Sequence, residues 1–453
     1  MKTSAWRYLW KAEDIRRKLL ITLLILVIYR LAAHVPVPGA DRNAIAAIIS
    51  GGGAGSTFVG ILDMLSGGTV SNFSVLAMGV YPYITAQIIL QLLVPIIPAL
   101  QQKMEDDPQE GRKWMERWTY ILAVPMAALQ AIGQIRIFSS LAGGVQIINN
   151  FGFSGSSLLP SLAIITSMTA GTMFAIWLGE LISEYGIRNQ GLSLLIFAGI
   201  VSRIPQNFIS IMNNYQNRWL TLAILLLLTV LIIYAIVFVQ QGQRNIPVMY
   251  PGRRVGNRQS MPVKGALPLK VNMAGMIPLI FGQSLLTFPA IVASFFIGSQ
   301  TYWVSNLASK TQALFGGTSP WYWLLYFLMV IGFTFFYTDV LFAQQDYGSN
   351  LKRAGAQIPG VSRGAPTQRY LTKVLRRITF PGAFFLGTIA VLPFVVGAGL
   401  TAAGLSTFNS SGSGTMLITS SGLLIVVGVV RDTFQNIDAE LKLHGYDEKL
   451  LVR

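Results

Sequence analysis

Few side chains in this sequence could serve as a nucleophile, a base or a metal ligand. It contains no cysteine, and its two histidines are His34 and His444. The tetrapeptide GFSG places Ser154 in the G-x-S-G pattern of intramembrane serine proteases, but that chemistry needs a histidine base beside the serine at membrane depth. Both histidines are expected at or beyond the ends of apolar segments, so we interpret the match as chance.

Phosphate chemistry and metal chemistry have no better support. The sequence contains neither a G-x-x-x-x-G-K-[ST] loop nor an H-E-x-x-H motif. The neighbouring carboxylates Glu105, Asp106, Asp107 and Glu110 are better explained as charge balance in a solvated loop than as metal ligands. We therefore predict a protein that is not an enzyme and that needs neither a cofactor nor a metal.

Long apolar segments dominate the chain. Hydrophobic residues make up 53% of it and charged residues only 11%, too little charge to cover a water-soluble protein of 453 residues. Runs of roughly 20 apolar residues predict an all-α membrane protein with many spans. We predict ten spanning helices, at approximately 19–34, 73–97, 118–137, 159–178, 192–211, 219–240, 271–297, 320–343, 376–396 and 415–431.

Lysine and arginine assign an orientation to these spans. Of the 34 basic residues, 28 lie in or directly beside six segments, namely 1–18, 98–117, 179–191, 241–270, 344–375 and the tail after 431. Because basic loops stay on the cytoplasmic side, these segments are predicted to be cytoplasmic. Both termini would then lie on that side, which requires an even number of spans.

Ten spans divide into five plus five. An odd number of spans per half reverses the direction of the second half, and such inverted halves usually build a pathway at their interface. The predicted domains are an amphipathic cytoplasmic N-terminus (1–18), an N-terminal half (19–211), a C-terminal half (212–431) and a cytoplasmic tail (432–453).

Two of the predicted cytoplasmic segments are long and strongly basic. Ordinary orientation bias and contact with anionic lipids explain part of this charge. Since both loops contain Pro–Gly turns that can hold them rigid, we favour a docking surface for a polyanionic partner, such as ribosomal RNA or an acidic protein face. The candidate docking residues are Arg244, Arg253, Arg254, Arg258, Lys264, Lys352, Arg353, Arg363 and Arg369.

The centres of the predicted spans carry small and neutral polar residues. The set comprises Gly79, Thr85, Gln87, Gln91, Asn272, Gly275, Gly282 and Gln283. An ion-coupled transporter should place an ionisable group near mid-membrane, and none of the predicted spans has one at its centre. Neutral polar groups can hold helices together, and they also suit a path that passes diverse material without retaining it. From the residues alone, a channel and an inverted-repeat secondary transporter both remain open.

Three long segments have distinctive sequences. They are SGGTVSNFSVLAMGVYPYITAQIILQLL (66–93), LPLKVNMAGMIPLIFGQSLLTFPA (267–290) and FFYTDVLF (335–342). They resemble the SecY family, the pore subunits of the bacterial Sec protein-conducting channel, and the resemblance continues through the whole chain in order. Two departures from the family pattern are PGVSRG (359–364), which places Arg363 one position late, and GIRNQGLS (186–193), which adds a residue and Arg188.

The resemblance implies ten helices in two inverted halves around a central hourglass pore. A ring of aliphatic side chains and a short plug helix would close that pore. By position, the ring residues would be Val80, Ile84, Ile196, Ile280 and Ile425. The plug would lie within about 57–71, with Phe58, Ile61, Leu62, Met64 and Leu65 as apolar contacts and Gly67 and Gly68 as a hinge.

The resemblance also implies a lateral gate between the second and third spans and the seventh and eighth. Its weak polar contacts would come from Thr85, Gln87, Gln91 and Asn272. Unfolded secretory polypeptides would cross the bacterial cytoplasmic membrane through the pore, and transmembrane segments would leave sideways into lipid. The implied partners are SecE-like and SecG-like small subunits, the SecA ATPase or the ribosome, signal peptides and nascent chains, anionic lipids, and accessory proteins of the YidC or SecDF type.

Overall fold

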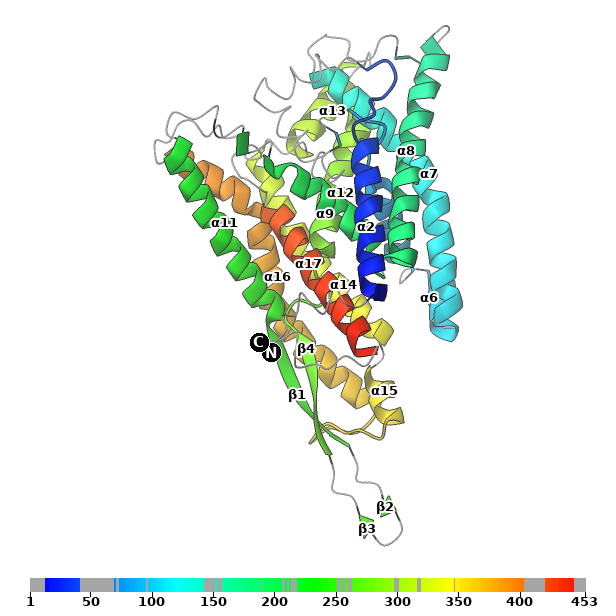
Figure 1. The fold of residues 1–453 in the computed structure, drawn as a ribbon, viewed down its shortest axis with the longest axis vertical. Coiled ribbons are helices and arrows are strands. Elements are labelled where there is room, and N and C mark those ends of the chain that lie inside the picture. Colours follow the sequence, from blue (N-terminus) through cyan, green and yellow to red (C-terminus); the bar gives the residue numbers. More distant parts are fainter. Residues whose placement is uncertain are drawn as a thin grey trace. The chain divides into compact units, whose positions relative to one another are not determined.

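The computed structural model of the chain is mostly helical (Figure 1). It describes residues 13–40, 69–70, 73–94, 97–141, 151–152, 157–188, 190–205, 208–209, 212, 218–250, 254–255, 258–259, 263–296, 301–315, 319–345, 347–402 and 420–443. The helices are α2 (Glu13–Ala32), α5 (Tyr81–Leu93), α6 (Pro98–Asp106), α7 (Pro108–Leu141), α8 (Leu158–Tyr185), α9 (Gly191–Ser202), α11 (Arg218–Gln241), α12 (Ile277–Ser294), α13 (Tyr302–Phe315), α14 (Pro320–Gln345), α15 (Tyr347–Arg353), α16 (Ala365–Ala402) and α17 (Ser420–Leu443).

Several of these helices can cross a membrane. Within the described residues, α7, α8, α11, α14 and α16 are long and apolar enough to do so. The pair α5 and α6 would make a sixth span that is bent by 99°, and α9 and α12 contain shorter apolar helices. A mostly helical membrane protein is therefore confirmed.

The chain separates into two compact units. Unit 1 comprises Met1–Leu226, Ser284–Tyr322 and Pro393–Arg453, and unit 2 comprises Leu227–Gln283 and Trp323–Leu392. A core of unit 1 gathers Val37, Phe73, Met168 and Ile291, with the rings of Phe73 and Phe138 packed edge to face at 5.4 Å. Unit 2 has its own core, described below with the strands.

The predicted start of the second span, residue 73, is wrong. Residues 73–80 form turns, and the helix α5 begins only at Tyr81. The backbone of this stretch bonds to a distant segment, since Val37 N–H donates to Phe73 O at 3.0 Å and Val75 N–H donates to Val35 O at 2.9 Å. Phe73 and Gly79 have positive φ angles of 43° and 52°, which a helix does not allow.

Three further differences from the sequence prediction matter for the site. The seventh span begins at Ile277 rather than 271, because residues 271–276 make a turn. The ninth begins at Ala365 rather than 376, so its first turns carry basic residues. The amphipathic helix α13 lies between the seventh and eighth predicted spans, where we expected only a loop.

Strands replace most of the first basic loop. β1 (Gln243–Tyr250) pairs antiparallel with β4 (Val263–Lys270), from Gln243 opposite Lys270 to Tyr250 opposite Val263. The short strands β2 (Arg254–Val255) and β3 (Arg258–Gln259) pair between them (Figure 1). Along β1 the side chains of Ile246 and Val248 are buried and their neighbours are exposed, as expected for a hairpin with one covered face.

Candidate functional site

A row of polar contacts follows the start of α5 in unit 1. The Tyr81 hydroxyl donates to the carbonyl of Ser284 in α12 at 3.2 Å. One turn later, the Thr85 hydroxyl donates to Tyr81 O at 3.0 Å and accepts from the Gln130 side-chain amide of α7 at 3.4 Å. Thr85 is buried, so this predicted gate residue already contacts a neighbouring span.

Two amide oxygens near this row have no partner. The side-chain Oε1 atoms of Gln91 and Gln130 are buried and accept no hydrogen bond from the described part of the chain. Gln87 is partly buried on the same helix. Two hydrogen-bond acceptors in this row are therefore unused, although the side chains of Thr85 and Gln130 already pair between α5 and α7.

The predicted pore-ring residues lie on short helices or at helix ends. In unit 1, Val80 directly precedes α5, Ile84 lies in its first turns, Ile196 is in α9 and Ile425 is in α17. Helices α9 and α17 pack against each other. In unit 2, Ile280 is in the first turn of α12. All five are buried or partly buried, but their arrangement as a ring stays a prediction.

The predicted plug residues, Phe58, Ile61, Leu62, Met64, Leu65, Gly67 and Gly68, lie outside the described residues. The chain is described again at Thr69 and Val70, both buried. The Thr69 hydroxyl donates to Leu76 O at 2.6 Å, and Val70 packs into the core with Phe73. The last residues of the predicted plug segment, after its glycine hinge, are thus firmly attached to unit 1.

Asn272, the gate candidate of unit 2, closes a turn of its own. Its side-chain amide donates to Gly275 O at 3.1 Å, and its Oδ1 accepts from Gly275 N at 2.9 Å. Gly275 has a φ of 65°, a left-handed conformation that glycine adopts without strain. This turn, which holds the chain just before α12, was not predicted from the sequence.

Of the serine and the two histidines considered for protease chemistry, only His34 is described. Ser154 and His444 lie outside the described residues. Nδ1 of His34 lies 2.7 Å from Arg30 O, one turn back in the chain, so this nitrogen carries the ring proton and donates it.

The two basic loops fold together as one body in unit 2. Met249 of β1 and Gln357 exchange two backbone hydrogen bonds of 2.8 and 2.9 Å. Beneath them, Ile246, Val248 and Leu269 of the hairpin share one hydrophobic core with residues of the second loop and its flanking helices. The latter are Phe342, Leu351, Ala356, Ile358, Leu371, Leu375 and Ile378. We call this body the cytoplasmic body, after the side of the membrane that the sequence predicts for both loops.

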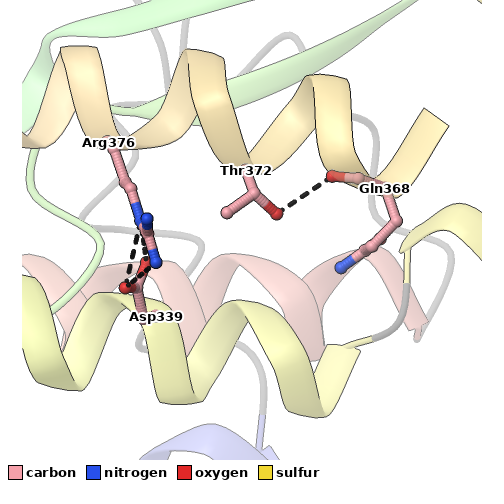
Figure 2. Close-up of polar contacts among 4 residues, drawn as sticks. All are labelled: Asp339, Gln368, Thr372 and Arg376. Atoms are coloured by element: carbon pink, nitrogen blue, oxygen red, sulfur yellow. Dashed lines mark hydrogen bonds and ion pairs between the residues drawn. The ribbon is translucent and has the colours of Figure 1, made fainter. Parts of the chain in front are cut away.

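Polar contacts fix the second loop within the cytoplasmic body. The Gln368 side chain accepts from Gly348 N–H at 2.8 Å at the start of α15, and its backbone carbonyl accepts from the Thr372 hydroxyl at 2.9 Å (Figure 2). Gly360 and Gly364 have φ angles of 81° and 90°, and Arg363 lies between these two left-handed positions. Two glycines in the left-handed conformation therefore bracket Arg363 in the PGVSRG segment.

Basic side chains cover the cytoplasmic body. The predicted docking residues Arg244, Lys264, Lys352, Arg353, Arg363 and Arg369 are all exposed. The backbones of Arg254 and Arg258 belong to β2 and β3, and Arg253 lies outside the described residues. The structure therefore brings together cations that are about a hundred residues apart in the sequence.

The first turns of α16 add a basic groove that the sequence interpretation left out. Arg369, Lys373, Arg376 and Arg377 line an open groove of about 420 Å³ together with Gln368 and Thr372. Arg369, Lys373 and Arg377 follow one another at intervals of four residues, and Arg376 comes three residues after Lys373. These spacings place all four on one face of the helix. Asp339 of α14 pairs with Arg376 (Figure 2), with Oδ2 2.9 Å from Nη2. The i, i+4, i+7 pattern in the sequence could have revealed the groove once the helix was known to begin at Ala365.

The first and last described helices meet in unit 1. Lys18 Nζ of α2 lies 2.6 Å from Glu440 Oε1 of α17. The Asn436 side chain donates to Arg188 O at 3.2 Å, in the turn between α8 and α9. Arg188, one of the departures from the family pattern, is thus tied to α17.

Comparison with known families decides what these parts belong to. A family model described as SecY matches residues 74–434, which is most of the chain. The chain belongs to the SecY family. SecY-family membership is confirmed by relatives that align over nearly their whole length. A protein translocase subunit SecY of Streptomyces galbus is 35% identical and covers 98% of this chain and 99% of its own. That of Aquifex aeolicus is 36% identical and covers 96% of each chain.

Solved structures support the same SecY fold. One, described as the structure of a protein conducting channel, has a TM-score of 0.62 at 17% identity and covers 96% of this chain and 95% of its own. Another comes from work on how the plug domain of the SecY protein stabilises the closed state of the translocation channel. It has a TM-score of 0.60 at 18% identity, with the same coverage.

Proposed function

We propose that this chain is the protein-conducting subunit of a translocase, a passive and gated channel for unfolded polypeptides across the cytoplasmic membrane. The observation that carries the proposal is its similarity to SecY translocase subunits over nearly the whole length of both chains. Several apolar helices of spanning length support the membrane location.

The chemistry of the buried polar residues favours a channel over the alternative, an ion-coupled secondary transporter. Apart from tyrosines, every buried polar side chain in the described part of the chain is Thr, Ser, Gln or Asn, and none of them is charged. A coupled transporter needs an ionisable residue within its spans, because protonation or ion binding there drives its cycle. The buried residues described here fit a path that does not hold its passenger.

For the architecture, we infer ten spans in two inverted halves, 19–211 and 212–431, flanked by a cytoplasmic N-terminus and tail. The ion pair of Lys18 with Glu440 supports an even number of spans, since it joins the start of the first helix to the end of the last. The short helices α5 and α9, of 13 and 12 residues, support a pathway built from interrupted spans.

The seal of this channel would be the ring of Val80, Ile84, Ile196, Ile280 and Ile425. A narrow aliphatic ring loses its water, which blocks ions at rest, and it makes no lasting hydrogen bonds to a passing chain. The plug within 57–71 would close the outer side. The firm attachment of Thr69, Val70 and Phe73 supports a plug that moves about a fixed downstream end.

For the lateral gate, we propose that Thr85, Gln87, Gln91 and Asn272 supply its polar contacts. The buried Oε1 atoms of Gln91 in α5 and Gln130 in α7 accept no hydrogen bond from the described residues. They are the spare acceptors that support this proposal. Hydrogen bonds between membrane helices are worth only about 1 kcal/mol each, which suits a seam that must open for a signal segment.

The cytoplasmic body would dock the partner that supplies the energy, either a SecA-type ATPase or a translating ribosome. Its exposed arginines and lysines support binding to an acidic protein face or to RNA. Within the membrane, the other subunits of the complex would be SecE-like and SecG-like proteins. Anionic lipids and accessory proteins of the YidC or SecDF type complete the proposed partners.

Site-specific cross-linking with a stalled secretory polypeptide tests the channel. A photo-reactive residue placed at Ile84, Ile196 or Ile280 should label the stalled chain, because each would face the passenger at the narrowest point. Leu231 of α11 is 62% exposed on an apolar spanning helix and is the matched control that should face lipid and stay unlabelled.

Equal labelling at Leu231 and at the ring positions would mean that the passenger does not follow the proposed path. Absence of labelling at all three ring positions, with the stalled chain otherwise bound, would defeat the channel proposal. Saturable uptake of a small solute by vesicles that contain the purified chain would favour the transporter.

A further inference from the structure

The helix α13 lies outside the spanning helices and has two different faces. Its inner face is held by unit 1, since Ala308 is only 5% exposed and Phe315 packs against the core that contains Phe73 and Ile291. Both anchors belong to the same unit as the helix. The position of α13 on the protein is therefore fixed.

The outer face of α13 carries an apolar strip. Trp303, Leu307 and Leu314 are 71%, 54% and 36% exposed, and their spacing of four and seven residues aligns them along one edge of the helix. Lys310 is exposed next to this strip, and Tyr302, at 83%, opens the helix. Bulky apolar side chains this exposed on a fixed helix need a nonaqueous neighbour.

Two hydroxyl groups of α13 are satisfied within the helix itself. The Thr311 hydroxyl donates to Leu307 O at 2.9 Å, and the Ser309 hydroxyl donates to Asn306 O at 3.0 Å. Such back-bonding removes the need for water or a polar protein partner at these two positions. The helix can therefore lie where the water concentration falls.

The place of α13 in the chain brings it to the membrane surface. It follows α12 after a short connection and precedes α14, which begins at Pro320. The ends of these neighbours are rich in exposed aromatic residues, with Phe296 after α12 and Trp321 at the start of α14. Trp219 at the start of α11 is exposed in the same way. Tryptophan and tyrosine accumulate at the level of the lipid headgroups.

We propose that α13 is an interfacial anchor, which lies in the headgroup region on the non-cytoplasmic side with the strip of Trp303, Leu307 and Leu314 in lipid. Lys310 would extend to the phosphates beside the strip. The exposed aromatic residues at the ends of α11, α12 and α14, all in the same unit as α13, favour lipid over a separate protein partner. The anchor would hold the outer end of unit 1 at a fixed depth.

Spin labels on single cysteines test this inference, and the natural chain is convenient because it has no cysteine. Leu307→Cys places a nitroxide on the strip, and Ser309→Cys places a matched one on the other edge of the same exposed face. The purified full chain is reconstituted in vesicles of phosphatidylethanolamine and phosphatidylglycerol. Collision rates are then measured with oxygen, which is enriched in lipid, and with a water-soluble nickel chelate.

We expect the ratio of oxygen to nickel collisions to be higher at position 307 than at 309. Equal and high nickel access at both positions would place the strip in water and overturn the proposal. Shielding of position 307 from both reagents would mean that a protein surface covers it, which overturns the proposal as well. The inference rests on the membrane location and orientation of the proposed function but not on its pore, so its failure would leave the proposed channel function standing.

Discussion

Arg376 of α16 holds Asp339 of α14 in a two-nitrogen ion pair. Nη2 lies 2.9 Å from Oδ2, and Nε lies 3.2 Å from Oδ2 and 3.3 Å from Oδ1 (Figure 2). Arg376 lines a basic groove together with Arg369, Lys373 and Arg377, so the acidic Asp339 contacts one residue of the groove lining. One of the four cations of the groove is therefore neutralised in this state, and its side chain is oriented by the neighbouring span.

Asp339→Asn should strengthen binding of an RNA-bearing partner to the cytoplasmic body. The amide keeps the shape of the carboxylate but frees the charge of Arg376 for a phosphate. Each added phosphate contact steepens the fall of log affinity with log salt by about 0.7–0.9. Binding of ribosomes to the reconstituted chain, measured over a series of salt concentrations, should show tighter binding at low salt and a steeper slope.

Glu184→Gln in α8 is the matched control, because it changes the net charge by the same amount in the other unit. If both variants steepen the slope equally, the effect is one of overall charge and the pair has no special role. A slope unchanged by Asp339→Asn would mean that the groove does not contact the partner's phosphates.

Leu269→Ala should loosen the cytoplasmic body while leaving the spans intact. Leu269 is fully buried in the core shared by the hairpin and the second loop, and such truncations cost about 2–4 kcal/mol. Hydrogen exchange followed by mass spectrometry should show lost protection of the amides in both β1 and β4 and in 351–358. Met249→Ala, a change at an exposed side chain of the same hairpin, should leave protection unchanged. Loss of protection confined to β4 would contradict a shared core.

The sequence predicted long helices well and the cytoplasmic body poorly, for a physical reason. A helix such as α11 is recognised from its own residues, since its hydrogen bonds are internal and its apolar run is continuous. The strand β4 contains Gly265 and Pro268, which disfavour strands locally. It is stabilised by contacts with residues such as Leu351 and Leu371, far away in the sequence, which a local pattern cannot reveal.

The same distinction applies to the candidate site. The docking cations could be identified from charge alone, and the structure brings those of both loops onto one body. The start of the second span could not be identified from the sequence, because the turn at 73–80 depends on backbone bonds to Val35 and Val37. Pairings such as Asp339 with Arg376 join separate helices, so they emerge only once the helices are packed.

Asn272→Leu should change how strictly signal sequences are selected, and the structure suggests by which route. Both described hydrogen bonds of the Asn272 side chain hold the turn at Gly275. Gly275→Ala disturbs the same turn without removing Asn272, at a cost of about 1–2 kcal/mol from its left-handed backbone, and its added methyl group meets open space.

The measurement is export, in living cells, of proteins that carry defective signal sequences. We expect Asn272→Leu to alter export strongly and Gly275→Ala to alter it in the same direction but less. An effect of Asn272→Leu alone would assign the role to a contact across the gate rather than to the turn. Export identical to that of the parent chain in both variants would remove Asn272 from the gate.

Cysteines at positions 18 and 440 should cross-link within one chain. Lys18 and Glu440 form a contact of 2.6 Å between α2 and α17, and their side chains are only 27% and 19% exposed. Because the chain has no other cysteine, a short bifunctional maleimide can react only at the two introduced sites. Reaction should require a reagent present on the cytoplasmic side, since an even number of spans puts both helix ends there.

The pair of positions 18 and 307 is the control that should not cross-link, because the loop containing α13 is predicted on the opposite side. Absence of the cross-link, with the cysteine at 18 labelled from the cytoplasmic side and the one at 440 only from the opposite side, would mean an odd number of spans, and the two inverted halves would then have to be abandoned.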